Sequence, residues 1–146
     1  MSAARTLLGF DYGKKRIGVA VGQALTATAT PAETLHCRND QPDWAGIARL
    51  IDTWRPHALI VGLPLNMDGT EHELTEAARG FGRELEQRFA LPVHWIDERL
   101  TSIEAGHLLA GTTRSARRRK ADIDKVAAQL ILETWLAHNK AQSLRD

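Results

Sequence analysis

The chain has one cysteine, no long apolar run and no excess of charge of either sign. Cys37 cannot form an internal disulfide and has no second cysteine at metal-ligand spacing, so we interpret it, with its neighbour His36, as a strand end rather than a metal site. No stretch approaches the ~18 apolar residues of a membrane helix, and residues Met1–Thr6 lack the apolar core of a signal peptide. We therefore expect a cytoplasmic protein. The 19 Lys and Arg residues against 18 Asp and Glu leave a net charge of +1, which indicates no particular partner.

The length and composition indicate one domain. A chain of 146 residues fits the usual size of ~100–200 residues per domain, so we expect a single domain over residues 1–146. The hydrophobic and charged shares, 43% and 25%, are typical of globular domains and exclude a disordered or collagen-like chain. Internal repeats and low-complexity segments are also absent from the sequence, and its one charge run is Arg114–Lys120.

The first 36 residues predict three strands. The apolar runs Thr6–Tyr12 and Ile17–Gln23 are separated by the polar tetrad Gly13-Lys14-Lys15-Arg16, which is typical of a β-hairpin. Residues Ala27–His36 alternate small and apolar residues around Pro31. This pattern favours a third strand at a sheet edge, where a missing N–H is tolerated.

The rest of the chain alternates helices and strands and ends in two helices. We predict a helix between the cap Asp43 and Pro56, a buried strand Ala58–Gly62, a helix opened by a capping box of Thr70 and Glu73 and ending near Arg88, a strand Pro92–Ile96, a short helix Thr101–Leu109, a loop Ala110–Lys120 and a last helix Asp122–Lys140. This order predicts an α/β fold with a mixed five-stranded sheet flanked by helices. In such sheets the functional crevice lies at the carboxyl ends of the parallel strands.

Acidic residues gather at those predicted ends. Asp11 ends the first strand, Asp97 and Glu98 follow the fifth, and Asp122 and Asp124 open the last helix. Converging carboxylates repel one another unless a cation lies between them, because ionised groups are costly away from water. Oxygen-only ligands favour Mg²⁺ or Mn²⁺, and one or two such ions can assist an in-line displacement at a phosphodiester. The pattern therefore indicates metal-assisted phosphoryl chemistry.

Each acid also has a structural interpretation that spacing alone leaves open. Asp11 is consistent with an Asx-turn, and Glu98 with an ion pair to Arg99. Asp122 is consistent with a helix cap, and Asp124 with a residue that complements the helix dipole. Because side chains alternate along a strand, only one of Asp97 and Glu98 is expected to face the crevice, and periodicity does not decide which.

Four segments of the chain resemble the YqgF (RuvX) family. They are LGFDYGKKRIGVAVG at Leu8–Gly22, IVGLPLNMDGTEHELT at Ile60–Thr75, DERLTSIEA at Asp97–Ala105 and DIDKVAAQLILE at Asp122–Glu133. They occur in the order of the family pattern and extend over nearly the whole chain. The resemblance implies an RNase H-like, resolvase-type fold and a nuclease that matures the 5′ end of pre-16S ribosomal RNA. The same family is also labelled Holliday junction resolvase.

The resemblance also implies which residues carry the chemistry. The acid of the first motif is Asp11, the acid of the DER motif is Glu98, and the acid that opens the final helix is Asp124. These three residues are the expected catalytic and metal-binding residues. The comparison thereby favours Glu98 over Asp97 and Asp124 over Asp122.

A further set of residues is predicted to contact substrate phosphates. Lys14 and Arg16 belong to the hairpin turn after Asp11, although a solvated turn explains them equally well. Asn66 lies in a polar loop before a helix, where donors can hold a phosphate. Arg99 either clamps a phosphate or neutralises Glu98. The basic run just before Asp124 contributes Arg117, Arg118 and Lys120.

The leading hypothesis is a metal-dependent endonuclease that acts on structured RNA as a monomer or weak homodimer, with no membrane association. Resolution of four-way DNA junctions is the runner-up, and its two symmetric cuts would require a dimer. The string FDYGKKRIGVAVG also resembles the phosphate-binding hairpin of actin-like ATPases, but the chain holds only one copy. A non-catalytic module for ribosome assembly or transcription is the third alternative.

Overall fold

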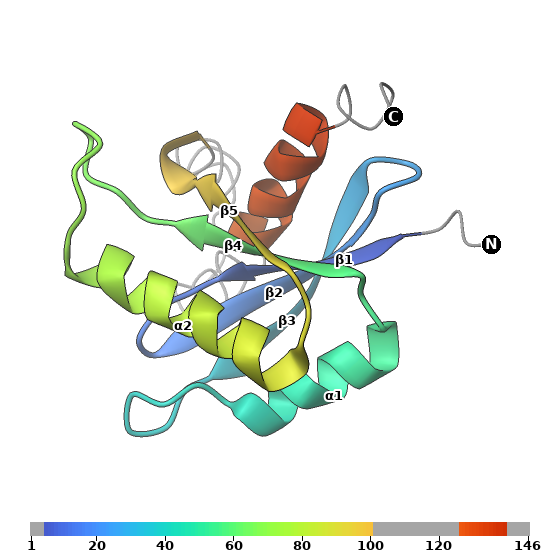
Figure 1. The fold of residues 1–146 in the computed structure, drawn as a ribbon, viewed down its shortest axis with the longest axis horizontal. Coiled ribbons are helices and arrows are strands. Elements are labelled where there is room, and N and C mark those ends of the chain that lie inside the picture. The colour runs from blue at the N-terminus through green and yellow to red at the C-terminus, as the bar shows by residue number, and fades with distance from the viewer. Residues whose placement is uncertain (1–4, 101–125, 140–146) are drawn as a thin grey trace, which may run out of the picture.

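The computed structural model describes residues 5–100 and 126–139. Its elements are β1 (Thr6–Asp11), β2 (Arg16–Gln23), β3 (Thr28–His36), α1 (Trp44–Trp54), β4 (Ala58–Leu63), α2 (Glu73–Phe89), β5 (Val93–Asp97) and a 3₁₀ turn, η1 (Glu98–Leu100). Residues 126–139 form a helix, drawn in red in Figure 1, so the described part of the last predicted helix is confirmed. The predicted helix Thr101–Leu109 and loop Ala110–Lys120 lie outside the described residues.

The strands form one mixed sheet in the order β3-β2-β1-β4-β5. β2 pairs antiparallel with both β1 and β3, whereas β4 pairs parallel with both β1 and β5. The predicted hairpin and the five-stranded mixed sheet are therefore confirmed. Pro31 lies on the edge strand β3, opposite Ala20 and beside an irregularity in the pairing. The edge position accommodates the missing N–H of the proline, as the sequence predicted.

Helices cover both faces of the sheet. Alternation along β1 points Leu8 and Phe10 into a core with α1 and α2, and Leu7 into a second core with the helix of residues 126–139. Figure 1 shows α1 and α2 on one side of the sheet and the red helix on the other. The three layers explain why β4, an interior strand between β1 and β5, is buried along its whole length.

Glycines bring the helix of residues 126–139 close to the sheet. A Cβ atom at Gly22 would lie 2.7 Å from Cδ2 of Leu132, and one at Gly9 would lie 3.1 Å from Cβ of the same leucine. At the far end of the helix, Leu136 packs in one cluster with Leu7 and Ala58, the residues near the starts of β1 and β4. The described helix thus runs from the carboxyl ends of the parallel strands toward their amino ends.

Helix α1 begins and ends as the sequence predicted. The side chain of Asp43 accepts a hydrogen bond of 2.9 Å from the backbone N–H of Gly46 and caps the helix. Arg55, in the left-handed conformation, closes the helix just before Pro56. Among residues 5–100 and 126–139, no helix is long and apolar enough to cross a membrane.

Helix α2 begins two residues later than the predicted capping box. Its N-cap is His72, whose Nδ1 accepts a hydrogen bond from the N–H of Leu74, while the hydroxyl of Thr75 accepts one from the N–H of His72. The predicted capping box of Thr70 and Glu73 is wrong because the Thr70 hydroxyl is used within the preceding loop, where it donates to Asp68 at 2.6 Å.

Candidate functional site

The carboxyl ends of the parallel strands lie along one edge of the sheet. β1, β4 and β5 are neighbours, with β4 in the middle, and end at Asp11, Leu63 and Asp97. Glu98 follows β5 directly and begins the 3₁₀ turn η1. This edge is where the sequence predicted the functional crevice.

The side chains of Asp11 and Glu98 are hydrogen bonded to each other. Asp11 shares its sheet face with Leu7, which is the face that the helix of residues 126–139 covers. The structure thus brings together, across β4, two of the three acids that the sequence selected. Asp124, and Asp122 beside it, lie outside the described residues.

Gly62 on β4 makes this meeting sterically feasible. A Cβ atom at position 62 would lie 2.8 Å from Cγ and 3.0 Å from Oε2 of Glu98, both closer than an ordinary contact. The side chain of Glu98 therefore occupies the space above Gly62 on its way to Asp11.

The environment of Glu98 favours its uncharged form. Burial raises the pKa of Glu98 from 4.5 to about 7; the hydrogen bond with Asp11 works in the lowering direction, and the charge of Asp97 adds to the rise. A hydrogen bond between two carboxyl groups requires that one of them carry a proton. A divalent cation can replace such a proton, because it offsets the same repulsion. Two convergent carboxyl groups with oxygen donors fit a Mg²⁺ or Mn²⁺ site.

Asp97 and Arg99 form a separate ion pair next to Glu98. Nε and Nη2 of Arg99 donate to Asp97, the latter at 2.7 Å, and the backbone N–H of Arg99 does so at 2.9 Å. These contacts hold the pKa of Asp97 below its usual value. Arg99 thus neutralises Asp97, whereas the sequence had left a pairing with Glu98 open. Strand alternation separates the roles of the two acids, with Asp97 paired to Arg99 and Glu98 to Asp11.

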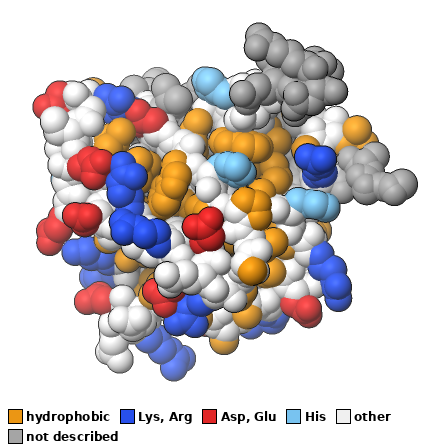
Figure 2. Space-filling model, in the orientation of Figure 1, with side chains coloured by type: hydrophobic (Ala, Val, Ile, Leu, Met, Phe, Trp, Pro, Cys, Tyr) orange, Lys and Arg blue, Asp and Glu red, His pale blue; other side chains and the backbone are white. Residues whose placement is uncertain are grey.

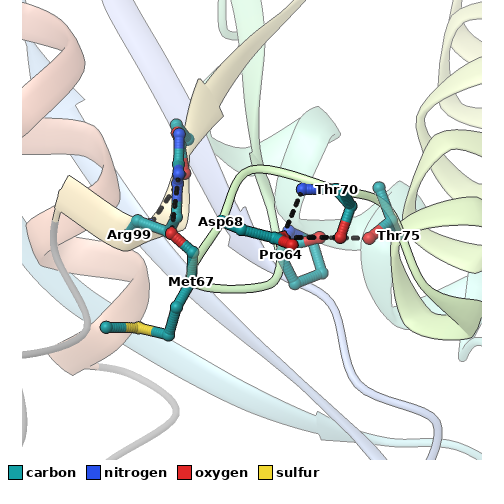
Figure 3. A network of polar contacts seen from close by, with 7 residues as sticks. Pro64, Met67, Asp68, Thr70, Thr75 and Arg99 are labelled. Carbon is teal, nitrogen blue, oxygen red and sulfur yellow. Dashed lines mark hydrogen bonds and ion pairs between the residues drawn. The ribbon is translucent and has the colours of Figure 1, made fainter.

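The segment of residues 64–72 between β4 and α2, here called the β4–α2 loop, is held by internal hydrogen bonds (Figure 3). The N–H of Asn66 donates to the carbonyl of Thr70 at 2.9 Å, and its side chain donates to the Thr70 hydroxyl. Asp68 accepts from both the N–H and the hydroxyl of Thr70, which lowers the pKa of its carboxyl. At the end of the loop, the hydroxyl of Thr75 donates to the carbonyl of Pro64.

The structure places some of the predicted phosphate contacts near this edge, and others lie outside the described residues. Lys14 is exposed and lines a shallow hollow at the N-terminal end of α2 together with His72. Arg16 begins β2, and Asn66 lies in the β4–α2 loop with one donor used by Thr70. Arg117, Arg118 and Lys120 lie outside the described residues. Among the described residues, no three His, Cys, Asp or Glu side chains cluster as a metal site, so the described part supplies two of the proposed ligands.

Charges of both signs are mixed on the face shown in Figure 2, where Lys and Arg side chains lie among Asp and Glu side chains. This matches the net charge of +1 and means that no large patch of one sign covers this face. On this face, recognition of a charged partner must therefore depend on local groups.

Comparison with known proteins identifies the family. The sequence model of the family described as "RuvX: Holliday junction resolvase" matches residues 5–138. The chain belongs to the RuvX family. Two RuvX relatives carry the name "Putative pre-16S rRNA nuclease". The one from Azotobacter vinelandii is 53% identical over 142 residues, 97% of this chain and 99% of the relative. The one from Pseudomonas putida is 50% identical over 140 residues, 95% and 99% of the two chains.

A solved structure supports the fold of this RuvX chain. The structure called "T. thermophilus RuvC in complex with Holliday junction substrate" matches with a TM-score of 0.51 and 15% identity, covering 94% of this chain and 96% of that chain. At this identity the similarity concerns the fold. It confirms the RNase H-like, resolvase-type fold that the sequence motifs implied.

Sequence reasoning missed two parts of the RuvX site. The sequence pattern indicates Gly62 only as the last residue of the predicted strand Ala58–Gly62, and Asp97 only as the alternative to Glu98. The spacing of Asp97 and Arg99, two residues apart at a strand end, was the available signal for their pairing. No local signal was available for Gly62, since its neighbour Glu98 comes from another strand end.

Proposed function

We propose that this RuvX chain is a metal-dependent nuclease that hydrolyses phosphodiester bonds at the 5′ end of pre-16S ribosomal RNA. The observation that carries the proposal is the hydrogen-bonded carboxyl pair of Asp11 and Glu98 at the carboxyl ends of the parallel strands. The relatives at about 50% identity, named for this activity, support the choice of substrate. A ribosomal precursor as substrate also makes the cytoplasm the proposed place of action.

Asp11, Glu98 and Asp124 are the proposed ligands of one or two Mg²⁺ or Mn²⁺ ions. Bound there, such an ion would supply Lewis acidity at the phosphodiester. The direction of the last helix supports including Asp124, since residue 126 lies at the helix end nearer the carboxyl ends of the strands, and Asp124 precedes it by two residues in sequence. Asp11 and Glu98 stand on a rigid scaffold. Asp11 ends β1, the central strand of the sheet, and Glu98 follows β5, which pairs with β4.

The proposed substrate contacts are the basic and amide side chains around this edge. Lys14 and Arg16 border Asp11 in the hairpin, and Asn66 lies in the β4–α2 loop. The Arg99 side chain has five N–H groups. Nε and Nη2 each donate one hydrogen bond to Asp97, and Nη1 donates one to the carbonyl of Met67, so further donors are available to a phosphate. The remaining proposed contacts are Arg117, Arg118 and Lys120.

The test is cleavage of a precursor fragment spanning the 5′ end of 16S RNA with Mg²⁺ or Mn²⁺. We expect Asp11→Asn and Glu98→Gln each to lower the cleavage rate by at least about 100-fold, in the range seen for groups that stabilise transition-state charge. Asp52→Asn is the matched control, because it removes the same charge from an exposed position on α1. Equal rates for Asp11→Asn and the control would contradict the proposal.

Resolution of four-way DNA junctions is the second candidate. The description of the matching family favours it. It requires a dimer for two symmetric cuts, whereas a single cut in RNA is compatible with the proposed monomer or weak homodimer. Precursor RNA, linear duplex and a four-way junction should be compared under one metal and salt condition. Faster cleavage of the junction than of the RNA would favour this candidate.

Normal cellular function of an Asp11→Asn, Glu98→Gln double variant would instead favour a non-catalytic assembly module. We also propose that the activity resides in a single domain over residues 1–146. Cleavage by the purified full chain without further proteins tests that part.

A further inference from the structure

Met67 is the most exposed large apolar side chain among the described residues. Its exposed fraction is 87%, compared with 71% for Leu25 and 42% for Trp54. It lies in the β4–α2 loop, and in Figure 3 its side chain extends away from the polar contacts of that loop. A single exposed apolar residue needs no explanation by itself. For Met67, however, its position and the hydrogen bonds of the loop indicate a role for the exposed side chain.

The polar groups of the β4–α2 loop contact one another and thereby fix the backbone that carries Met67. Asn66, Asp68 and Thr70 form hydrogen bonds within the loop, and the N–H of Gly69 donates to the carbonyl of Asn66 at 2.8 Å. Gly69 has a φ of +89°, a conformation that favours glycine. The loop thus holds its polar side chains together and turns Met67, its most exposed large apolar side chain, outward.

The loop is also tied to the carboxyl pair. Nη1 of Arg99 donates to the carbonyl of Met67 at 3.2 Å, and the guanidinium lies where a Cβ atom on Gly69 would be 3.3 Å away. Arg99 is fixed by Asp97 and follows Glu98 directly in the chain. Arg99 therefore connects the backbone at Met67 to the segment that carries Glu98, the residue proposed to act on the phosphodiester.

We propose that Met67 is a wedge that packs against an unstacked or terminal base of the nucleic acid beside the scissile phosphate. Nucleic-acid-binding proteins insert apolar side chains, methionine among them, between base steps, and the thioether also packs favourably on aromatic rings. The wedge positions the strand so that the phosphate meets Asp11 and Glu98. This inference rests on the proposed nuclease function and identifies the substrate feature as a base at a junction of paired and unpaired strands.

The test compares Met67→Ala with Met67→Leu, which keeps an apolar side chain of similar size. Leu25→Ala is the matched control, because Leu25 is also exposed but lies in the β2–β3 turn, at the opposite end of the sheet. Binding is measured in the Asp11→Asn background, with precursor RNA carrying 2-aminopurine on each side of the boundary between paired and unpaired strands. Thermal unfolding checks that all variants are folded.

We expect a rise in 2-aminopurine fluorescence at one position when the protein with its native Met67, or the Met67→Leu variant, binds, and no rise with Met67→Ala. The affinity of Met67→Ala should fall about three- to tenfold, because alanine is too short to pack against the base. In the active background, KM should rise by a similar factor. If Met67→Ala cleaves and binds RNA like the Leu25→Ala control, the wedge is overturned while the nuclease function stands. If no variant binds or cleaves any nucleic acid, both proposals fail.

Discussion

At the residue scale, the space above Gly62 is the feature on which the carboxyl pair depends. In Gly62→Ala the new methyl group would lie 2.5 Å from Cδ1 of Ile131 and 2.8 Å from Cγ of Glu98. The end of the isoleucine side chain can rotate away, but displacement of Glu98 moves its carboxyl group from Asp11. We expect cleavage to fall at least about tenfold, with a loss of about 1–3 kcal/mol in the free energy of unfolding from overpacking. Cleavage kinetics and urea denaturation measure the two effects.

Gly80 supplies the control for this substitution. It is exposed on α2, and a Cβ atom there would have no neighbour within 4 Å. Gly80→Ala should therefore stabilise the protein by about 0.5–1 kcal/mol, because alanine costs less backbone entropy in a helix, and should leave cleavage unchanged. Full activity in Gly62→Ala would show that Glu98 does not need its present position.

The sequence could place Asp11 and Glu98 at strand ends, and the family resemblance could select them, because strand ends and motif positions are local properties. It could not predict that Glu98 lies over Gly62, since the contact joins two strands whose pairing the sequence does not state. The side-chain partner of Arg99 was open for a related reason. Glu98 and Asp97 are both near it in sequence, and only the direction of each side chain at the end of β5 separates them.

At the scale of the element, the start of α2 shows that hydrogen bonds within a loop can prevent a capping-box sequence from forming the capping box. Thr70 and Glu73 have the spacing of a capping box, but Thr70 already binds Asp68 and Asn66. The cap passes to His72, a residue type outside the usual preference for Ser, Thr, Asp and Asn. The sequence therefore predicted the helix correctly and its first residue incorrectly.

This assignment of the cap predicts a stability difference at His72. In His72→Ala the N–H of Leu74 loses its acceptor, so we expect the free energy of unfolding to fall by about 0.5–2 kcal/mol. His72→Asn should retain most of the stability, because its amide oxygen can accept the same bond. Urea denaturation of both variants is the measurement, with His57→Ala as the control for loss of an exposed imidazole. A cost in His57→Ala equal to that in His72→Ala would contradict the assignment.

At the scale of the whole molecule, the sheet order brings together acids that are far apart in sequence. Hydrophobic patterns predicted the hairpin, the edge strand and the buried parallel strand. They did not state that β4 lies between β1 and β5, and this order is what places Asp11 and Glu98 at strand ends on either side of β4. The family motifs favoured Glu98 over Asp97, a choice that periodicity left open, and the sheet order explains why Glu98 lies near Asp11.

The stability of the whole protein should record the protonation of the carboxyl pair. The pKa of Glu98 is raised to about 7 in the folded protein, above its usual 4.5. The folded state therefore binds more protons than the unfolded state between these values. The stabilisation from this group is complete below pH 4.5 and is lost as the pH rises through 7. Without metal, we expect the free energy of unfolding to fall by about 2 kcal/mol more in the wild type than in Glu98→Gln between about pH 5 and pH 8.

Urea denaturation in EDTA across that range measures the difference, and Asp52→Asn should keep the wild-type pH dependence. Parallel curves for the wild type and Glu98→Gln would contradict the raised pKa.

Added Mg²⁺ or Mn²⁺ supplies a second test of the same pair. Because a cation and a proton compete for the carboxyl groups, metal should raise the melting temperature of the wild type more at about pH 8 than at about pH 5. Glu98→Gln should lose most of that rise, since it retains only one carboxylate of the pair.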